Sequence, residues 1–343
     1  MRKKYFPTIL LIITVWLFTH CAPKNEEYTF NKGQIFGTYY SITYLHPKKA
    51  DLQEQIEIKL DEFDNSLSTF NPNSIISRIN ANDSTVVTDD FFNSMYHMAH
   101  QVSETSNGAF DITVAPLVNA WGFGFGNHDH SVSPNLDTII PYIGFQKIKL
   151  QNNRIIKQDN RIMLDASAIA KGQSCDVIAM LLEENGCENY MVEIGGEITC
   201  KGLNPKGEKW HIGIDRPIDD PSNEDKELQV ILAISNVGLA TSGNYRQFYM
   251  KDGKKYAHTI NPKTGLPVSH NLLSATVIAP TCMQADAYAT AFMVLGVERS
   301  LEICNQLDDM ECYLIYSDKD TTIKTVYSNG FQKYFAEHIG RKN

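Results

Sequence analysis

Four stretches of the chain carry apolar residues three or four positions apart, which is the spacing of one face of a helix. The first runs through Leu52, Ile56, Leu60, Phe63 and Leu67. A second helix is predicted after Thr88, and two more at residues 171–185 and 282–295. Thr281 is a suitable N-cap for the last of these helices, and Gly296 is a suitable stop.

Short runs rich in β-branched and aromatic residues predict strands between these helices. Asn152 and Asn153 fit the turn of a hairpin. The expected strands are residues 35–45, 147–150, 154–157, 161–164, 190–194, 197–200, 211–214, 229–234, 273–278, 312–316 and 322–327. Strands come in neighbouring pairs more often than they alternate with helices. This arrangement predicts an α+β fold with paired antiparallel strands and packed helices.

The N-terminus predicts a targeting segment. A basic start at residues 2–4 precedes an apolar run from Thr8 to Thr19. As a helix, those 12 residues span about 18 Å, well short of the roughly 30 Å hydrocarbon core of a bilayer. We therefore expect residues 1–20 to be a signal peptide that is removed on export.

Cys21 closes this run in a sequence that loosely resembles a bacterial lipobox, with Phe18 where Leu is usual and His20 where a small residue is usual. Two interpretations are open, a lipoprotein acylated at Cys21 or a plain secretory signal, and the motif favours the lipoprotein. An acyl chain there would anchor the protein to a membrane surface on the exported side. The expected organisation is a tether at residues 21–32 and one domain at residues 33–335.

Charge narrows the class of partner. The chain has 31 Lys and Arg residues against 40 Asp and Glu residues, a net charge of −9. Removal of residues 1–20 takes away three positive charges and no acid, which lowers the net charge to −12. A chain this acidic, with no basic cluster after its first four residues, is not expected to bind nucleic acid. An anionic substrate needs a local positive group, such as a metal ion or backbone N–H groups.

Three positions offer chemistry. Asp286 and Thr290 lie four residues apart on the last predicted helix, so their oxygens share one face and can supply two ligands to Mg²⁺, with a solvated helix face as the alternative. The segment from Leu164 to Gly172 leads into a helix start, where backbone N–H groups and the mobile cation of Lys171 favour a phosphate group. His258 lies in a turn-rich loop and is a candidate general base, with turn packing as the alternative.

Nine motifs, taken in order, make the chain resemble the ApbE family, whose members are FAD:protein FMN transferases and often exported lipoproteins. The likeness extends from about residue 33 to residue 335. The motifs are FGTYYSI at 36–42, STFNPNS at 68–74, GAFD at 108–111, WGFG at 121–124, DASAIAKGQSCD at 165–176, EIGGE at 193–197, TSGNY at 241–245, HTINPKTG at 258–265 and DAYAT at 286–290. The resemblance implies an α+β fold with a T-fold-like core.

It also implies a reaction and a set of site residues. The reaction moves FMN from FAD to a Ser or Thr hydroxyl of an acceptor protein and releases AMP. Mg²⁺ would be bound by the side chains of Asp286 and Thr290 and by the backbone carbonyl of Ala168. The implied FAD contacts are Phe36, Phe70, Ala109, Phe110, Asp111, Asp165, Lys171 and Ile260. The family often has Met in place of Phe36 and Tyr in place of Phe70.

The chemistry suits an acidic chain. Mg²⁺ on the pyrophosphate neutralises developing charge and supplies the local positive field. His258 would take the proton of the acceptor hydroxyl, since an imidazole exchanges protons near neutral pH. Two alternatives stay open: a Mg²⁺-dependent FAD pyrophosphatase that gives FMN and AMP, with water as the nucleophile at the same site, and a non-catalytic flavin-binding lipoprotein.

Overall fold

The computed structural model describes residues 27–125, 134–217, 227–244, 248–251, 254–320 and 322–336. The predicted signal peptide and the acylation site at Cys21 lie outside these ranges. Among the helices within them, none is long and apolar enough to span a bilayer.

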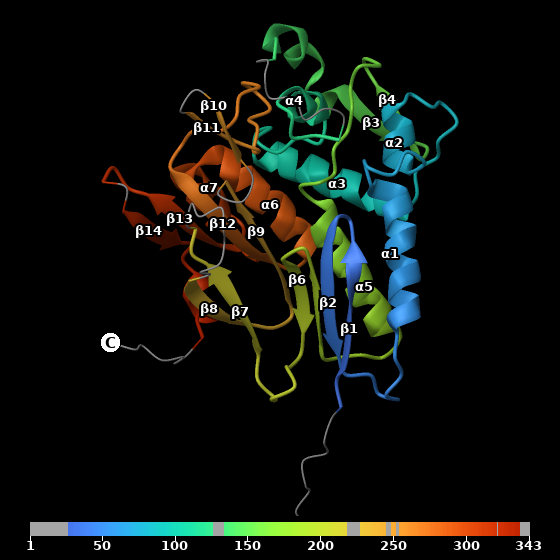
Figure 1. Cartoon of the computed structure of the whole chain (residues 1–343), viewed down its shortest axis with the longest axis vertical. Coiled ribbons are helices and arrows are strands. Elements are labelled where there is room, and N and C mark those ends of the chain that lie inside the picture. Colours follow the sequence, from blue (N-terminus) through green and yellow to red (C-terminus); the bar gives the residue numbers. More distant parts are fainter. Residues whose placement is uncertain are drawn as a thin grey trace, which may run out of the picture.

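The centre of the fold is an eight-stranded sheet in which every neighbouring pair of strands is antiparallel (Figure 1). The strand order is β1-β2-β5-β6-β9-β12-β13-β14. The strands are β1 (Thr29–Ile35), β2 (Thr38–Tyr44), β5 (Tyr190–Ile194), β6 (Glu197–Lys201), β9 (Val237–Gly243), β12 (Leu272–Ala279), β13 (Glu311–Ser317) and β14 (Ile323–Tyr327). This architecture confirms the predicted α+β class.

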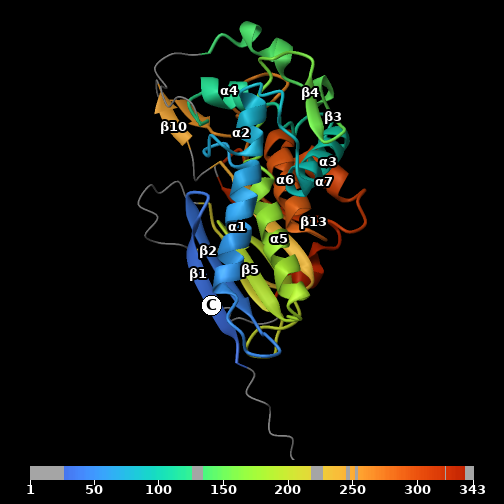
Figure 2. The same cartoon turned by 90° about the vertical axis from the view of Figure 1, so that its right-hand side faces the viewer.

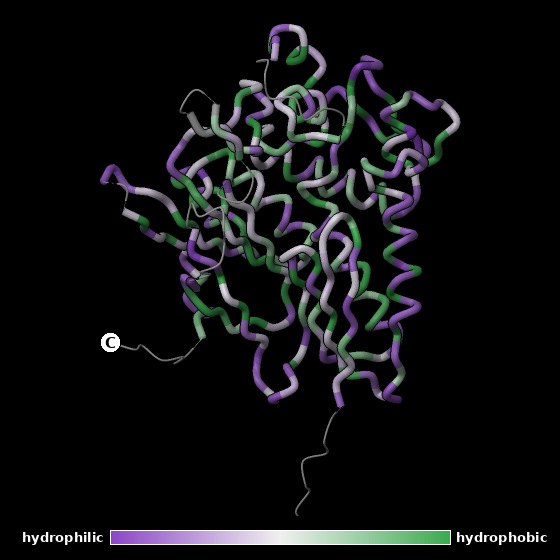
Figure 3. Tube along the Cα trace, viewed as in Figure 1, coloured by the Kyte–Doolittle hydropathy of each residue, from purple (hydrophilic) through white to green (hydrophobic). Residues whose placement is uncertain are grey.

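Three helices cover one face of the sheet: α1 (Gln53–Leu67), α5 (Ala170–Glu184) and α6 (Cys282–Leu295). The helix α5 contacts both α1 and α6 (Figures 1 and 2). The α1 helix is amphipathic, with Ile56 and Leu60 buried and a largely polar outer side (Figure 3). In contrast, α6 is buried on nearly all sides because it lies between β9, β12, α5 and the helix α3 described below.

The predicted ends of α6 are confirmed. The Thr281 hydroxyl accepts the N–H of Gln284 at 3.2 Å, which satisfies a donor that the first helical turn leaves open. Gly296 ends the helix with a φ of 79°, a backbone conformation that favours glycine. The helix α7 (Val297–Cys304) follows at once and packs against α6 and β13.

A two-stranded hairpin, β7 (Trp210–Asp215) and β8 (Leu228–Ile234), covers part of the opposite face of the sheet. Its buried residues Ile212 and Leu232 join those of β6, β9 and β13 in one apolar core. The 3₁₀ helix η4 (Phe331–Tyr334) packs against β8 and β13 and completes this core.

The remaining elements gather toward one end of the sheet, at the top of Figure 1. They are α2 (Ile75–Asn80), α3 (Asp90–Thr105), α4 (Ala115–Ala120), β3 (Ile148–Gln151), β4 (Arg154–Lys157), β10 (Phe248–Lys251), β11 (Lys254–Ala257) and the 3₁₀ helices η1 (Leu136–Thr138), η2 (Ile140–Tyr142) and η3 (Phe145–Lys147). Asn152 and Asn153 make the predicted turn between β3 and β4, with φ of 51° and 53°. The second predicted helix is confirmed as α3.

Residues 35–45 were expected to form one strand, but they form the turn and second strand of a hairpin. β1 and β2 are separated by Phe36 and Gly37, whose φ angles of 54° and 71° reverse the chain. β1 begins at Thr29, so residues 29–32, assigned to the tether by the sequence, pair with β2 and belong to the domain.

The strand predicted at residues 161–164 is absent apart from a single bridge at Met163. The side chain of Asn80 takes the place of a neighbouring strand. Its Nδ2 donates to the carbonyl of Leu164 at 2.9 Å, and its Oδ1 accepts the N–H of the same residue at 2.7 Å. Because one amide satisfies both backbone groups, no strand ladder is needed there.

Candidate functional site

The N-terminus of α5 meets α6 at Gly172. The Gly172 N–H donates to Oδ2 of Asp286 at 3.0 Å. A Cβ atom at position 172 would lie 2.3 Å from the carbonyl oxygen of Cys282 and 2.7 Å from Cβ of Asp286. Glycine therefore lets the two helices approach closely, and this approach buries Asp286, which is 2% exposed. We call Lys171, Gly172, Glu197 and Asp286 the Lys171 cluster.

Lys171 lies between two buried acids. Its Nζ donates to Oε1 of Glu197 at 2.5 Å. Burial acts to lower the pKa of Lys171, but the charges of Asp286 and Glu197 outweigh it and raise that pKa. Burial raises the pKa of Glu197 to about 7 and also raises the pKa of Asp286, with the Lys171 charge opposing both shifts. The sequence predicted a mobile Lys171 side chain. The structure corrects this expectation, because the ion pair with Glu197 holds the ammonium in place.

Two further candidate oxygen ligands lie on α6 and on the segment that leads into α5. Thr290 lies one turn beyond Asp286 on α6, and its Oγ1 shares a hydrogen bond of 3.1 Å with Oγ of Ser242. In a regular helix the Gly172 N–H would bond the carbonyl of Ala168, but it bonds Asp286 instead. Within the described ranges no other backbone N–H donates to that carbonyl.

A carboxylate, a hydroxyl and a carbonyl without a backbone donor are ligand types that suit Mg²⁺. No group of three or more His, Cys, Asp or Glu side chains able to hold a metal occurs in the part of the chain that the structure describes. A metal at this place would therefore need the carbonyl and the hydroxyl as well as Asp286. The residues present fit the donor set that the resemblance implies.

Asp176 holds the start of α6 against α5. Its carboxylate oxygens accept the N–H groups of Cys282 and Met283 at 2.9 and 2.8 Å, and Oδ1 also accepts the hydroxyl of Thr199 at 2.7 Å. Burial raises the pKa of this carboxyl to about 6. A carboxylate at a helix N-terminus satisfies open donors and faces the positive end of the helix dipole. Asp176 thereby sets the position of α6 beside the cluster.

One group of predicted FAD contacts is buried in the protein. Ala109, Phe110 and Asp111 follow α3, and all three are buried. The Asp111 carboxylate accepts the N–H and the hydroxyl of Thr113 at 2.8 and 2.7 Å and the N–H of Phe145 at 2.8 Å. Burial raises the pKa of Asp111 in spite of these bonds. Hydrogen bonds within the protein thus fix the conformation of this segment, and its contact with FAD stays a prediction.

Asp165 connects this segment to the approach of α5. Its backbone N–H donates to the carbonyl of Ile112 at 2.8 Å, and its Oδ1 accepts the N–H of Ser167 at 2.8 Å. Burial raises the pKa of its carboxyl. The structure therefore brings Asp165 next to Ile112 and hence close to Asp111. This proximity is expected if Asp111 and Asp165 belong to one binding site.

A second group of predicted FAD contacts is aromatic and more exposed. Phe36, at the β1–β2 turn, is half-buried, with its ring centroid 5.7 Å from that of Phe63. Phe70 is 77% exposed and meets Phe125 edge-on at 6.5 Å. Exposed aromatic faces are suited to stack on a flat ligand ring.

His258 follows β11 in a loop that is held from beneath. The Trp121 indole N–H donates to the carbonyl of Gly265 at 2.7 Å, and Ile260 is buried with Trp121 in a small apolar cluster. The His258 imidazole is half-buried and lies edge-on to Phe123 at 6.4 Å. A firm loop thus presents the imidazole at its edge, while Ile260 packs inward.

We call Phe70, Phe123, Phe125 and His258 the aromatic rim. Phe123 and Phe125 belong to one short segment, and each contacts one of the other two rings. The rim therefore brings together Phe70 and His258, which lie far apart in the sequence.

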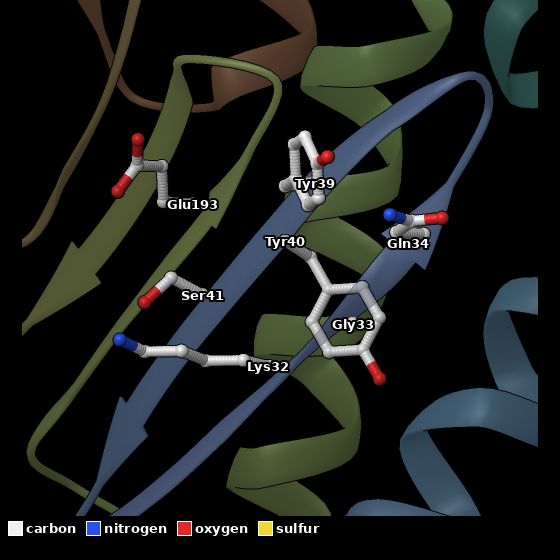
Figure 4. A pocket seen from close by; sticks show the side chains of 7 residues that line it. All are labelled: Lys32, Gly33, Gln34, Tyr39, Tyr40, Ser41 and Glu193. Carbon is white, nitrogen blue, oxygen red and sulfur yellow. The ribbon is translucent and has the colours of Figure 1, made fainter.

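A separate pocket of about 430 Å³ lies on the face of β1, β2 and β5 turned away from α5 (Figure 4). Its lining includes Lys32, Tyr39, Ser41 and Glu193. Burial raises the pKa of Glu193, and the Lys32 charge opposes that shift. None of the predicted site residues lines this pocket, so it is distinct from the Lys171 cluster.

Sequence reasoning did not single out Glu197, Asp176 or Ser242. Glu197 follows two glycines at the start of a strand and precedes Ile198, and an acid in such a position is a usable signal of a buried ion pair. Asp176 sits among apolar residues of α5 and carries a similar signal. For Ser242 the motif at 241–245 is the available signal, because a lone serine in a strand is ordinary.

Comparison with known proteins gives consistent results. A model of the ApbE family matches residues 36–314. FAD:protein FMN transferases of Vibrio cholerae and Escherichia coli K12 are 34% and 32% identical, over 96% and 98% of this chain and 99% of each relative. The solved flavin transferase ApbE from Vibrio cholerae is similar in structure, with a TM-score of 0.81 at 34% identity over 90% of this chain and 99% of that chain. The apo flavinyl transferase ApbE of Pseudomonas stutzeri has a TM-score of 0.80 at 28% identity, over 91% and 98%.

Proposed function

Because the chain belongs to the ApbE family, we propose that it transfers FMN from FAD to an acceptor protein. Its curated relatives named above are FAD:protein FMN transferases. The structural observation that carries the proposal is the Lys171 cluster. A buried carboxylate and a fixed ammonium at the N-terminus of α5 form the kind of place where a pyrophosphate and a divalent cation bind together.

The acceptor group in this proposal is a Ser or Thr hydroxyl, and the leaving group is AMP. The hydroxyl oxygen attacks the phosphorus of the FMN half of FAD, and a new P–O bond joins FMN to the acceptor. The P–O bond to the AMP half breaks, and its electron pair leaves with AMP. The hydroxyl proton passes to a base.

Asp286, Thr290 and the Ala168 carbonyl would hold Mg²⁺ in this scheme. The ion, when bound, neutralises charge on the pyrophosphate and on the departing AMP. Lys171 donates to a phosphate oxygen from a fixed position, because Glu197 already orients its ammonium.

His258 is the base in this proposal. Its imidazole stands at the aromatic rim, on a loop fixed through Trp121 and Gly265. A group at the rim can meet a hydroxyl presented by another protein. A base positioned in this way removes the proton as the new P–O bond forms.

The test is to incubate the purified protein with FAD, Mg²⁺ and a candidate acceptor, and to measure the acceptor by mass spectrometry. We expect an added FMN on a Ser or Thr, equimolar AMP, and loss of both products with EDTA. Free FMN and AMP beside an unmodified acceptor would identify a FAD pyrophosphatase instead. Bound FAD without turnover would identify a flavin-binding lipoprotein.

We also propose that the protein is exported and anchored to a membrane through an acylated Cys21. The short apolar run that ends at this cysteine supports the proposal. In a cell with lipoprotein machinery, Cys21→Ser is expected to move the protein from the membrane fraction to the soluble fraction. If wild type and variant are both soluble, the anchor is excluded.

A further inference from the structure

Two carboxylates compete for the Lys171 ammonium, and one of them holds it. Among the described acids, only Glu197 lies within 4.0 Å of Nζ. The Asp286 charge also raises the pKa of Lys171, against the effect of burial, so Asp286 acts on the ammonium without pairing with it. Asp286 instead accepts the Gly172 N–H.

A turn of two glycines lies against the pair of Lys171 and Glu197. Gly195 joins β5 to β6 with a φ of 65°. A Cβ atom there would lie 3.2 Å from Cδ of Lys171 and 3.4 Å from Oε2 of Glu197. The backbone therefore lies directly against both side chains and limits where the ammonium can go.

Stability alone does not account for Glu197. Its side chain is 6% exposed, and its Oε2 has no hydrogen-bond partner among the described residues. A buried carboxylate oxygen without a partner costs free energy of folding, and a buried ion pair is often no more stabilising than apolar side chains. The placement of Glu197 is better explained by what it does to Lys171.

We infer that Glu197 is a positioning residue that holds the Lys171 ammonium away from Asp286, and so leaves the Asp286 carboxylate available for a divalent cation. The inference rests on the metal role proposed above for Asp286. It adds a residue outside the ligand set, whose effect on the metal passes through Lys171.

Charge explains why this positioning is needed. Without Glu197, Asp286 is the carboxylate among the described residues whose charge still acts on the ammonium. A pair between Lys171 and Asp286 would occupy the carboxylate and place a positive charge beside the metal, and both effects weaken cation binding. With Glu197 in place, the ammonium keeps a partner when a cation binds Asp286.

A double-mutant cycle tests the inference through metal binding in the absence of FAD. The full chain is titrated with Mn²⁺ alone, and the free ion is measured by electron paramagnetic resonance. The four proteins are wild type, Glu197→Gln, Lys171→Met and the double variant. We expect Glu197→Gln to weaken Mn²⁺ binding about tenfold, a size typical of coupling within one ion-pair network. Lys171→Met should bind at least as tightly as wild type, and the double variant should match Lys171→Met within about twofold.

Equal losses from Glu197→Gln in the wild-type protein and in the Lys171→Met variant would overturn the inference, because Glu197 would then act through its own charge. Unchanged binding by Glu197→Gln would also overturn it. A wild-type protein that binds no Mn²⁺ would instead remove the proposed metal role, so the two failures are distinguishable.

Glu193→Gln is the matched control, since Glu193 is a partly buried acid on the neighbouring strand whose charge partner is Lys32. Its Mn²⁺ affinity should stay within about twofold of wild type. Circular dichroism confirms that each variant is folded. If Glu197→Gln does not fold, Glu197→Asp keeps the charge on a shorter side chain. It should weaken Mn²⁺ binding when Lys171 is present and not when methionine replaces it, and any other result rejects the positioning role.

Discussion

The Lys171 cluster and the aromatic rim belong to the same candidate site, but they are held in opposite ways. In the cluster, the Lys171 ammonium donates to Glu197 at 2.5 Å and the Gly172 N–H donates to Asp286 at 3.0 Å, which ties two helices and a strand together. In the rim, rings from loops meet edge-on at 6.4 and 6.5 Å, and Phe70 is 77% exposed. The groups suited to phosphate and metal are joined by short hydrogen bonds, whereas those suited to a large partner are held by ring contacts nearer the surface.

Small side chains explain the rigidity of the cluster. Gly172 lets α5 approach α6, and every second residue of one stretch of α6 is a buried alanine: Ala285, Ala287, Ala289 and Ala291. Small residues bring the backbones together, so the position of Asp286 is set by main-chain geometry rather than by flexible side chains. The rings of the rim contact each other edge-on, and Phe123 also packs against Tyr249 with the ring centroids 5.3 Å apart.

Removal of the Asp286 carboxylate is expected to have the largest effect on activity and tests the role of the Lys171 cluster. Asp286→Ala should lower Mg²⁺-dependent AMP release by more than about 100-fold, since even the outer partners of metal ligands cost 10–100-fold when lost. Release of AMP from FAD with and without EDTA measures the effect, and circular dichroism checks the fold. Wild-type turnover in the variant, unaffected by EDTA, would exclude the metal role.

His258→Ala tests the rim in the acceptor assay described above, in which mass spectrometry measures FMN transfer. A positioned base contributes about 10²–10⁴-fold to a rate, so FMN transfer should fall by that factor. FAD affinity should change little, because the base acts on the acceptor hydroxyl rather than on FAD. A variant that binds FAD poorly but reaches a normal maximal rate would show that His258 only shapes the loop.

The helices and paired strands could be predicted because their signals are local. Thr281 and Gly296 mark the two ends of α6 in the sequence, and the structure shows the cap and the positive φ. β9 could not be predicted, although it lies inside the sheet. It contains Gly238, which weakens the strand pattern in the sequence. A Cβ atom at this position would lie 2.2 Å from the N atom of Cys282, so the glycine is explained by the packing of β9 against α6 and not by a local preference.

The candidate site divides in the same way. The pairing of Asp286 with Thr290 follows from helical spacing, which any sequence displays. The partner of Lys171 does not, because Glu197 lies 26 residues away and many other acids were available. The Lys171–Glu197 pair depends on how α5 packs against β6, and the sequence pattern does not show this packing.

Gly172→Ala sharpens the contrast by loosening the cluster. A Cβ atom 2.3 Å from the Cys282 carbonyl forces α5 and α6 apart, and overpacking of this kind costs about 1–3 kcal/mol of unfolding free energy. Urea denaturation measures the loss, and weaker Mn²⁺ binding should accompany it. Met180→Ala is the matched control on α5, because Met180 is 60% exposed and its truncation should stay within about 0.5 kcal/mol. Equal stability of the two variants would mean that the helices tolerate a wider separation.

The smallest effect is expected at Phe70, where the rim is most exposed. Its contact with Phe125 is edge-on, and one aromatic pair contributes about 0.5–1.5 kcal/mol beyond the area it buries. Phe70→Ala should therefore weaken FAD binding by roughly tenfold, and Phe70→Tyr, which keeps the ring, by no more than about twofold. Fluorescence titration of FAD measures both, with Tyr39→Ala as the control, since Tyr39 is 70% exposed on the separate pocket. A loss above about 100-fold in Phe70→Ala would exceed what one aromatic contact supplies. It would show that the rim closes over FAD and is as well ordered in the complex as the Lys171 cluster.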